Sequence, residues 1–335
     1  MKKGLMAIVS LIAAVSIAGC GAADQTASTP QTGGDASAKP KVYTTIYPLE
    51  YVAKRIGGDH VEVTNIIPPG VEPHDYEPTA KDMVALANAD IFAYNGSGLE
   101  LWVDKAVGNL DKNKTVIVNA SEGLDLLKAT EHEHEHEGEA ATEEGHEHEG
   151  EAATEEHGHD HGEFDPHVWL DPTKLKAQAE KVKNTLVQKD QAHAADYEKN
   201  YAQLAADLDQ LDQEFKNMVS QAAKKEFMTS HSAFSYLANR YGLEQVAISG
   251  LNPADEPSPA ELKSLVEHVK EHNISYVMFE TLVSPKVAEV IAKEAGVKTA
   301  TLNPLEGLNE EDVKAGRDYL SIMRDNLETL KVALK

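Results

Sequence analysis

Several common features are missing from this sequence, and each absence narrows what the chain can be. Among 335 residues there is a single cysteine, Cys20, so no intramolecular disulfide can form. No P-loop pattern occurs, so we do not expect the chain to bind and hydrolyse a nucleoside triphosphate. The formal net charge of -25 argues against nucleic acid as a partner. Apolar residues still make up 41% of the chain, which is long enough for two ordinary domains with cores.

The first residues are predicted to be a lipoprotein signal peptide, residues 1–19. Lys2 and Lys3 precede the run LMAIVSLIAAVSIAG, which has the length of a signal-peptide core and is short for a membrane span. The run ends in IAGC, which resembles the bacterial lipobox and implies that Cys20 is lipidated. The alternative is an uncleaved membrane anchor, and under either interpretation the rest of the chain lies outside the cytoplasm. Residues 20–40 are small and mostly uncharged, which predicts a flexible tether.

From residue 41 onward, short β-like runs alternate with helical runs. This alternation predicts an α/β fold with two (β/α) lobes of mostly parallel sheet, at 41–190 and 222–335. The expected strands are 41–46, 61–67, 90–96 and 115–118 in the first lobe, and 226–230, 245–249, 274–280 and 298–302 in the second. In the second lobe, Ser258 can cap a helix, Pro259 suits its first position and Glu261 completes a capping box.

A single long helix is predicted to link the lobes, at residues 191–221. Its apolar residues follow a three-four spacing and form one stripe, made of Tyr197, Tyr201, Leu204, Leu208, Leu211, Phe215 and Met218. A continuous helix of this length rises roughly 45 Å, because each residue adds about 1.5 Å. Such a helix would be a stiff strut between the lobes. The alternative is two separate helices within one lobe.

Four candidate metal ligands each follow an expected strand. They are His74 in PPGVEPHDYEPT, His167 in DPHVWLDP, His231 in MTSHSAFSYL and Glu280 in VMFETLVSP. Because ligands of open α/β sheets lie beyond the carboxyl ends of strands, these side chains can converge in a cleft between the lobes. Imidazole and carboxylate both bind Zn²⁺, and nitrogen-rich ligation favours Zn²⁺ over Mn²⁺. Spacing alone leaves each histidine open to an ordinary surface role, and leaves Glu280 open to capping the next helix.

Four histidines elsewhere in the chain have less distinctive settings. His60 and His193 are expected to be ordinary surface residues. His268 and His272 are four apart on an expected helix, so they could chelate an ion together, although they sit in a charged run. We expect none of the four to belong to the main site.

A histidine-rich tract at 131–163 is predicted to be a disordered loop inserted in the first lobe. It contains 14 Asp or Glu, no Lys or Arg, and a repeated EHEGEAATEE unit, so it cannot form a core. Its histidines are candidate weak, interchangeable metal sites, namely His132, His134, His136, His146, His148, His157, His159 and His161. The functional interpretation is a zinc collector or sensor, and the alternative is a solvated insertion with incidental affinity.

Five motifs in order, PHDYEPT, DPHVWLDP, SHSAFSYLANRYGL, EPSPAEL and FETLVSPKVAE, together resemble the metal-binding lipoproteins of bacterial ABC importers. The match is closest to the zinc branch, of the ZnuA and AdcA type, and runs from about residue 41 to the C-terminus. The resemblance implies two lobes bridged by one long helix, with His74, His167, His231 and Glu280 as the four ligands of the metal held between them. Histidine-rich loops before the second ligand are a feature of the zinc branch.

This resemblance implies a binding protein, not an enzyme. It would capture Zn²⁺ outside the cytoplasm and deliver it to an ABC permease driven by a separate ATPase. The protein is expected to be a monomer, held by a lipid on Cys20 at the outer face of the cell membrane. The alternatives are a manganese-binding homologue and a zinc hydrolase in which Glu280 is a general base. An adhesin function would be a second role.

Overall fold

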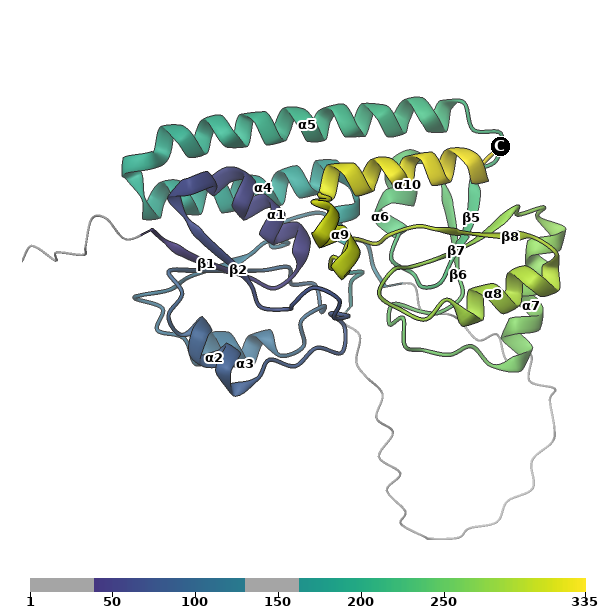
Figure 1. Ribbon diagram of the computed structural model, residues 1–335, viewed down its shortest axis with the longest axis horizontal. Helices are drawn as coiled ribbons and strands as arrows, with labels where there is room; N and C mark the ends of the chain where they lie inside the picture. Colours follow the sequence, from purple (N-terminus) through teal and green to yellow (C-terminus); the bar gives the residue numbers. More distant parts are fainter. Residues whose placement is uncertain (1–38, 130–162) are drawn as a thin grey trace, which may run out of the picture. The chain divides into compact units, whose positions relative to one another are not determined.

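The structure is a computed structural model that describes residues 39–129 and 163–335. The predicted signal peptide, Cys20 and the histidines of the tract lie outside the described residues. A strand occurs at each of the expected places (Figure 1). The strands are β1 Lys41–Thr44, β2 Glu62–Asn65, β3 Ile91–Tyr94, β4 Val116–Asn119, β5 Glu226–Thr229, β6 Glu244–Ala247, β7 Tyr276–Phe279 and β8 Lys298–Thr301.

The strands form two four-stranded parallel sheets with the same topology. The first sheet has the order β2-β1-β3-β4 and the second has the order β6-β5-β7-β8. In each sheet the second strand is added on one side of the first strand, and the third and fourth strands are added on its other side. The switch point therefore lies between β1 and β3 in the first sheet, and between β5 and β7 in the second. Such a switch point opens a crevice at the carboxyl ends of those strands, where ligands bind in open α/β sheets. The predicted α/β fold with two lobes is therefore confirmed.

Ten helices are present among the described residues. They are α1 Tyr47–Gly57, α2 Ala80–Leu86, α3 Val103–Gly108, α4 Pro172–Lys189, α5 Ala194–Ser220, α6 Ser235–Tyr241, α7 Pro259–Glu271, α8 Lys286–Ala295, α9 Glu310–Ala315 and α10 Tyr319–Ala333. Ser258 and Glu261 form the expected capping box at the start of α7. Within the described ranges, no helix combines the length and hydrophobicity that crossing a membrane requires.

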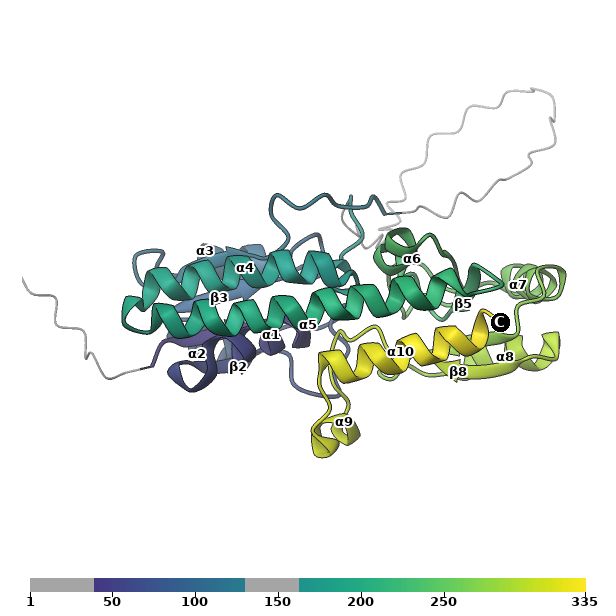
Figure 2. The same ribbon diagram turned by 90° about the horizontal axis from the view of Figure 1, so that it is seen from above.

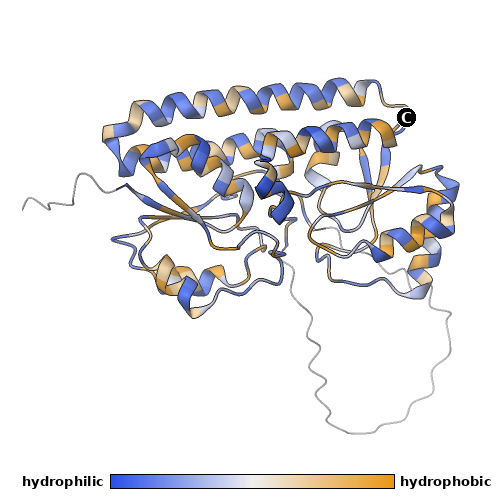
Figure 3. Ribbon diagram, viewed as in Figure 1, coloured by the Kyte–Doolittle hydropathy of each residue, from blue (hydrophilic) through white to orange (hydrophobic). Residues whose placement is uncertain are grey.

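Helix α5 is one uninterrupted helix of 27 residues, as expected from its apolar stripe. Figure 3 shows it striped with hydrophobic and hydrophilic residues, and Leu204, Leu208 and Phe215 on the stripe are buried. The helix extends over both sheets and lies beside α4 and α10 (Figures 1 and 2). The alternative of two separate helices is therefore wrong.

The two lobes share one interior. The largest hydrophobic cluster runs without interruption from Val42 in the first sheet, through Leu204 of α5, to Phe227 in the second sheet. The ring of Tyr51 in α1 stacks on that of Tyr319 in α10, with centroids 5.7 Å apart. Residues 39–335 accordingly form one compact unit. Since opening the lobes widely would expose this core, the fold favours small movements over a free hinge.

Candidate metal centre

Four side chains from both lobes meet in one buried group, which we call the central cage: His74, His167, His231 and Glu306. The Nε2 atom of His167 lies 3.3 Å from the Nε2 atoms of both His74 and His231. The Oε1 atom of Glu306 lies 3.2 Å from Nε2 of His167 and of His231, and 3.6 Å from Nε2 of His74. The imidazoles of His167 and His231 are 0% exposed and that of His74 is 7% exposed.

These separations match the edges of a tetrahedron around a zinc ion. Ligand atoms bonded at about 2.0–2.1 Å must lie about 3.3–3.4 Å apart, because a tetrahedral edge is about 1.63 times the bond length. Five separations in the cage lie between 3.2 and 3.6 Å. The Oε1 atom of Glu306 is within ion-pair distance of the imidazoles but makes no well-aligned hydrogen bond. Such a buried acceptor is costly unless a cation compensates it. The donor set and the geometry both suit Zn²⁺.

The cage forms where the carboxyl ends of strands from both sheets meet. His74 lies in the loop after β2, and His231 follows the end of β5 by two residues. Glu306 lies five residues beyond β8, and His167 opens the short 3-10 turn that leads into α4. The backbone N–H of His74 donates to the Glu72 carboxylate at 3.0 Å, which fixes the conformation of its loop.

The fourth residue of the cage is Glu306 and not Glu280, which the sequence analysis expected. The Oε2 atom of Glu280 lies 2.5 Å from Nδ1 of His231, and its Oε1 accepts the backbone N–H of His231 at 3.0 Å. Both contacts keep the carboxylate behind the ring, on the side opposite the Nε2 atom that faces the cage. Glu280 follows β7 directly, and β7 pairs with β5, so no loop is available to carry the carboxylate around the imidazole. The alternative cap role is not seen either, since the next helix, α8, begins at Lys286.

Glu306 reaches the cage because the chain bends toward the other cage residues after β8. The turn is held by Asn326 of α10, whose Oδ1 accepts the backbone N–H of Asn303 at 2.8 Å. Its Nδ2 donates to the carbonyl of Asn303 at 2.7 Å. Leu305 adopts a positive φ of 60°, and the indole N–H of Trp169 donates to the carbonyl of Pro304 at 2.7 Å. Since Trp169 stands two residues after His167, this bond links the positions of two cage residues.

His167 also has a carboxylate behind its ring. The Oδ1 atom of Asp165 lies 2.9 Å from Nδ1 of His167 and accepts its backbone N–H at 2.9 Å. A carboxylate at Nδ1 keeps a proton on that nitrogen, so the lone pair of Nε2 is free to face a metal. Two other acidic residues near the cage histidines have different roles. Asp171 caps α4, and Asp75 lies 3.4 Å from the side-chain amide of Asn252.

Without a metal, the carboxylates around the cage favour the protonated form of its buried imidazoles. Burial would lower the pKa of His231, but Glu280 and Glu306 outweigh it and raise this pKa well above 6.5. Burial likewise opposes Asp165 and Glu306 at His167, and the net result is a raised pKa. For Glu306, burial raises the pKa, but the imidazoles reverse this and hold it well below 4.5. One Zn²⁺ can therefore take the place of two ring protons without changing the charge of the site.

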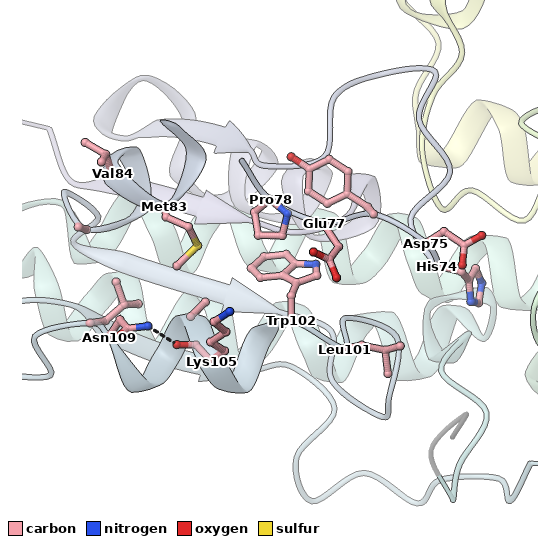
Figure 4. Close-up of a pocket in the computed structure, with 14 residues that line it drawn as sticks. His74, Asp75, Glu77, Pro78, Met83, Val84, Leu101, Trp102, Lys105 and Asn109 are labelled. Atoms are coloured by element: carbon pink, nitrogen blue, oxygen red, sulfur yellow. Dashed lines mark hydrogen bonds between the residues drawn. The ribbon is translucent and has the colours of Figure 1, made fainter. Parts of the chain in front are cut away.

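A groove of about 680 Å³ opens beside the cage, and Figure 4 shows its lining. The side chains of Met83, Val84 and Trp102 line it, with His74 at one end. His74 is the only cage residue in the lining. The groove therefore reaches the cage at His74, and its lining does not include His167, His231 or Glu306.

Comparison with known proteins identifies the family. Residues 42–333 match the family described as zinc-uptake complex component A, periplasmic. The chain belongs to this family. It is 41% identical over 318 residues to the high-affinity zinc uptake system protein ZnuA of Bacillus subtilis, covering 95% of this chain and 93% of that protein.

Other members of the zinc-uptake family extend this result. The chain is 42% identical over 299 residues to the zinc-binding lipoprotein AdcA of Streptococcus pneumoniae, covering 88% of this chain and 56% of AdcA. The chain thus spans about half the length of the AdcA relatives it matches. The crystal structure of the Zn(II)-bound ZnuA-like domain of that AdcA has a TM-score of 0.72 and 40% identity, covering 89% of this chain and 99% of that domain.

The histidines outside the cage follow two patterns. His60 and His193 stack on each other near the start of α5, with ring centroids 3.9 Å apart, and are partly exposed. His268 and His272 stack in the same way at the end of α7, but share the carboxylate of Glu226. The sequence analysis named the three histidines that the structure brings together in the cage, but it named neither Glu306 nor Asp165. Both residues lie in recognisable segments of the sequence: Glu306 is in TLNPLEGL, at the end of β8, and Asp165 begins DPHVWLDP.

Proposed function

We propose that the protein is the extracytoplasmic zinc-binding component of an ABC importer. It captures Zn²⁺ with His74, His167, His231 and Glu306 and delivers the ion to a membrane permease. The central cage carries this proposal, because its atom separations suit a tetrahedral zinc ion. Relatives named for zinc uptake and zinc binding, and a zinc-bound structure of the same fold, support it.

The donor set favours zinc over manganese, the nearest alternative cargo. Three of the four inward-facing atoms are imidazole nitrogens and one is a carboxylate oxygen. Mn²⁺ prefers oxygen ligands and higher coordination numbers, whereas Zn²⁺ accepts nitrogen in a tetrahedron. We therefore infer that Mn²⁺ binds this site more weakly than Zn²⁺.

We infer that the protein is not an enzyme. A zinc hydrolase keeps one metal position open for an activated water, and four protein ligands close that position. Glu280 is the residue that a hydrolase would use as a general base. Both of its carboxylate oxygens already contact His231, on the side of the ring that faces away from the cage. The side chains of Glu280 and Glu306 are each only 2% exposed, which leaves no room for a substrate beside them.

We propose that the protein lies outside the cytoplasm, and relatives named as periplasmic components or lipoproteins support this. We propose that it works with an ABC permease and its ATPase, and relatives named for a zinc-uptake complex and a zinc uptake system support this. The lipid anchor on Cys20 and a monomeric state are our proposals.

Labelling cells with a radioactive fatty acid tests the anchor, since Cys20→Ala should abolish both the label and the membrane association. Fatty-acid label on the Cys20→Ala variant would refute the lipid anchor at this residue.

Release of the ion is proposed to begin at the loop that carries His74. His74 is the most exposed imidazole of the cage, and its loop is fixed by Glu72 within the same segment. The other cage histidines are held by carboxylates that are themselves buried. Because both lobes share one core, movement of this loop exposes the ion at a lower cost than separation of the lobes.

Metal analysis of the full-length protein tests the function. Protein purified without added metal and dialysed against a weak chelator should retain one zinc ion per chain. The chelator removes any ion held by the histidine-rich tract. His231→Ala should lose that ion, while the matched control His193→Ala should retain it. Tightly held manganese, or zinc that His231→Ala still retains, would contradict the proposal.

A further inference from the structure

A second cluster of metal-binding side chains lies on the second lobe, and we call it the surface triad. It consists of Glu226, His268 and His272, whose ligand atoms all lie within 4.8 Å of one another. Glu226 is the first residue of β5, whereas His268 lies in the last turn of α7 and His272 caps that helix. Two rigid elements thus supply the three donors.

The three side chains of the surface triad face one another. His268 and His272 are four residues apart, so both imidazoles leave the same face of α7. Their ring centroids lie 3.9 Å apart, with an angle of 21° between the planes. One oxygen of Glu226 contacts Nε2 of His268 and the other lies 2.7 Å from Nδ1 of His272. Both ring nitrogens therefore converge on one carboxylate.

The electrostatic setting of the surface triad suits a cation. Burial raises the pKa of Glu226, but the two imidazoles outweigh burial and lower it, so the carboxylate is ionised. The end of α7 adds the partial negative charge of a helix C-terminus. The side chains of His268 and His272 are 31% and 45% exposed, so an ion can arrive directly from solvent.

We propose that Glu226, His268 and His272 bind one Zn²⁺ as a second metal site, with water in the remaining position. This site is separate from the cage, since Glu226 begins β5 and His231 follows its other end, and the strand alone spans about 10 Å at about 3.3 Å per residue. Three ligands and partial exposure make the ion weaker and faster to exchange than one in a closed four-ligand site. The site does not depend on the proposed transport function.

The molecule contains its own control for this proposal. His60 and His193 stack with centroids 3.9 Å apart and an angle of 19°, much as in the surface triad. Their carboxylate partners, however, come from two residues, because His193 contacts Asp190 at 2.6 Å and His60 contacts Asp196 at 3.1 Å. Among the described residues, this pair does not bring three donors within 4.8 Å.

Equilibrium dialysis of the full-length protein at micromolar free Zn²⁺ tests the site. Bound zinc is counted by atomic absorption for the wild type, for His268→Ala/His272→Ala and for His60→Ala/His193→Ala. The histidine-rich tract gives the same background in all three proteins. The first double variant should lose one ion per chain, and the second should lose none. Equal zinc content in all three proteins, or equal loss in both variants, would overturn the proposal.

A conservative variant distinguishes loss of zinc binding from loss of folding. Glu226→Gln keeps the shape of the side chain but removes its charge, so it should also lose one ion while its circular dichroism spectrum stays that of the wild type. An anomalous map at the zinc edge should then show an ion between the three wild-type side chains. An ion that appears only in crystals grown in millimolar zinc, with none counted by dialysis, would mean an adventitious ion only and would refute the site.

Discussion

The central cage and the surface triad use the same residue types in opposite settings. The cage has four inward-facing donors and is almost fully buried, whereas the triad has three donors and is partly exposed. Behind the cage rings of His167 and His231 stand Asp165 and Glu280, which orient them. In the triad, the only carboxylate is itself one of the three donors. Ligand type alone therefore does not determine a metal site, because burial and ring orientation separate a tight site from a weak one.

The largest expected effect is at Glu306. Glu306→Gln leaves the imidazoles without an anionic ligand, and breaking a buried charge pair costs about 3–5 kcal/mol. We expect zinc affinity at the cage to fall by at least about 100-fold in chelator competition. The matched control is Glu226→Gln, which should leave the affinity of the cage unchanged. An unchanged cage affinity in Glu306→Gln would contradict the assignment.

A smaller effect is expected at the residues behind the rings. Glu280→Gln and Asp165→Asn each weaken the contact that holds a proton on Nδ1, so each should reduce zinc affinity by about 10–100-fold. The surface triad has no such residue, and its occupancy should not change in either variant. A loss at Glu280→Gln larger than that at Glu306→Gln would indicate that the roles of the two glutamates are reversed.

The pH dependence should distinguish the metal-free cage from the loaded one. Because the pKa of His231 is raised in the folded state, protonated His231 stabilises the fold. This contribution is fully present below about pH 6.5 and is lost as the pH rises through the folded-state pKa. The lowered pKa of Glu306 contributes stability that is present above about 4.5 and is lost as pH falls through its own folded-state pKa. Metal-free protein should therefore lose stability as pH rises above about 6.5.

Zinc binding should show the opposite trend, because the ion must displace ring protons. The increase in melting temperature on adding one equivalent of Zn²⁺ should grow as pH rises from about 6 to about 8. Calorimetry at several pH values measures both trends. A zinc-induced increase that does not depend on pH would show that the rings are already neutral without the metal.

The smallest expected effect concerns α7, the helix that carries the two histidines of the surface triad. Ser258→Ala removes the side-chain cap of α7 and should lower the free energy of unfolding by about 1 kcal/mol. Ser258→Thr, which can still cap the helix, should lose much less. Urea denaturation measures both variants, and neither should alter zinc affinity at the cage. A loss in Ser258→Thr equal to that in Ser258→Ala would rule out capping as the cause.

Much of the fold follows from patterns that are local in the sequence. Alternating β-like and helical runs predict the two parallel sheets, and one apolar stripe predicts α5 as a single helix. The carboxyl-end rule for open sheets selects His74 and His231 as residues near a shared crevice. These features could be predicted because neighbouring residues determine them.

The identity of the fourth cage residue could not be predicted in this way. Glu280 and Glu306 both follow strands of the second sheet, so the rule that selects one selects the other equally. The difference arises from distant contacts, since β5 pairs with β7 and Asn326 holds the turn before Glu306. Glu226 joins the surface triad for the same reason, as it lies 42 residues from His268.

The most direct test of the account is a crystal structure of the full-length protein loaded with one equivalent of Zn²⁺. The account predicts a zinc ion bonded to Nε2 of His74, His167 and His231 and to a carboxylate oxygen of Glu306, at about 2.0–2.2 Å. A zinc ion bonded instead to Glu280, with Glu306 turned away, would contradict it.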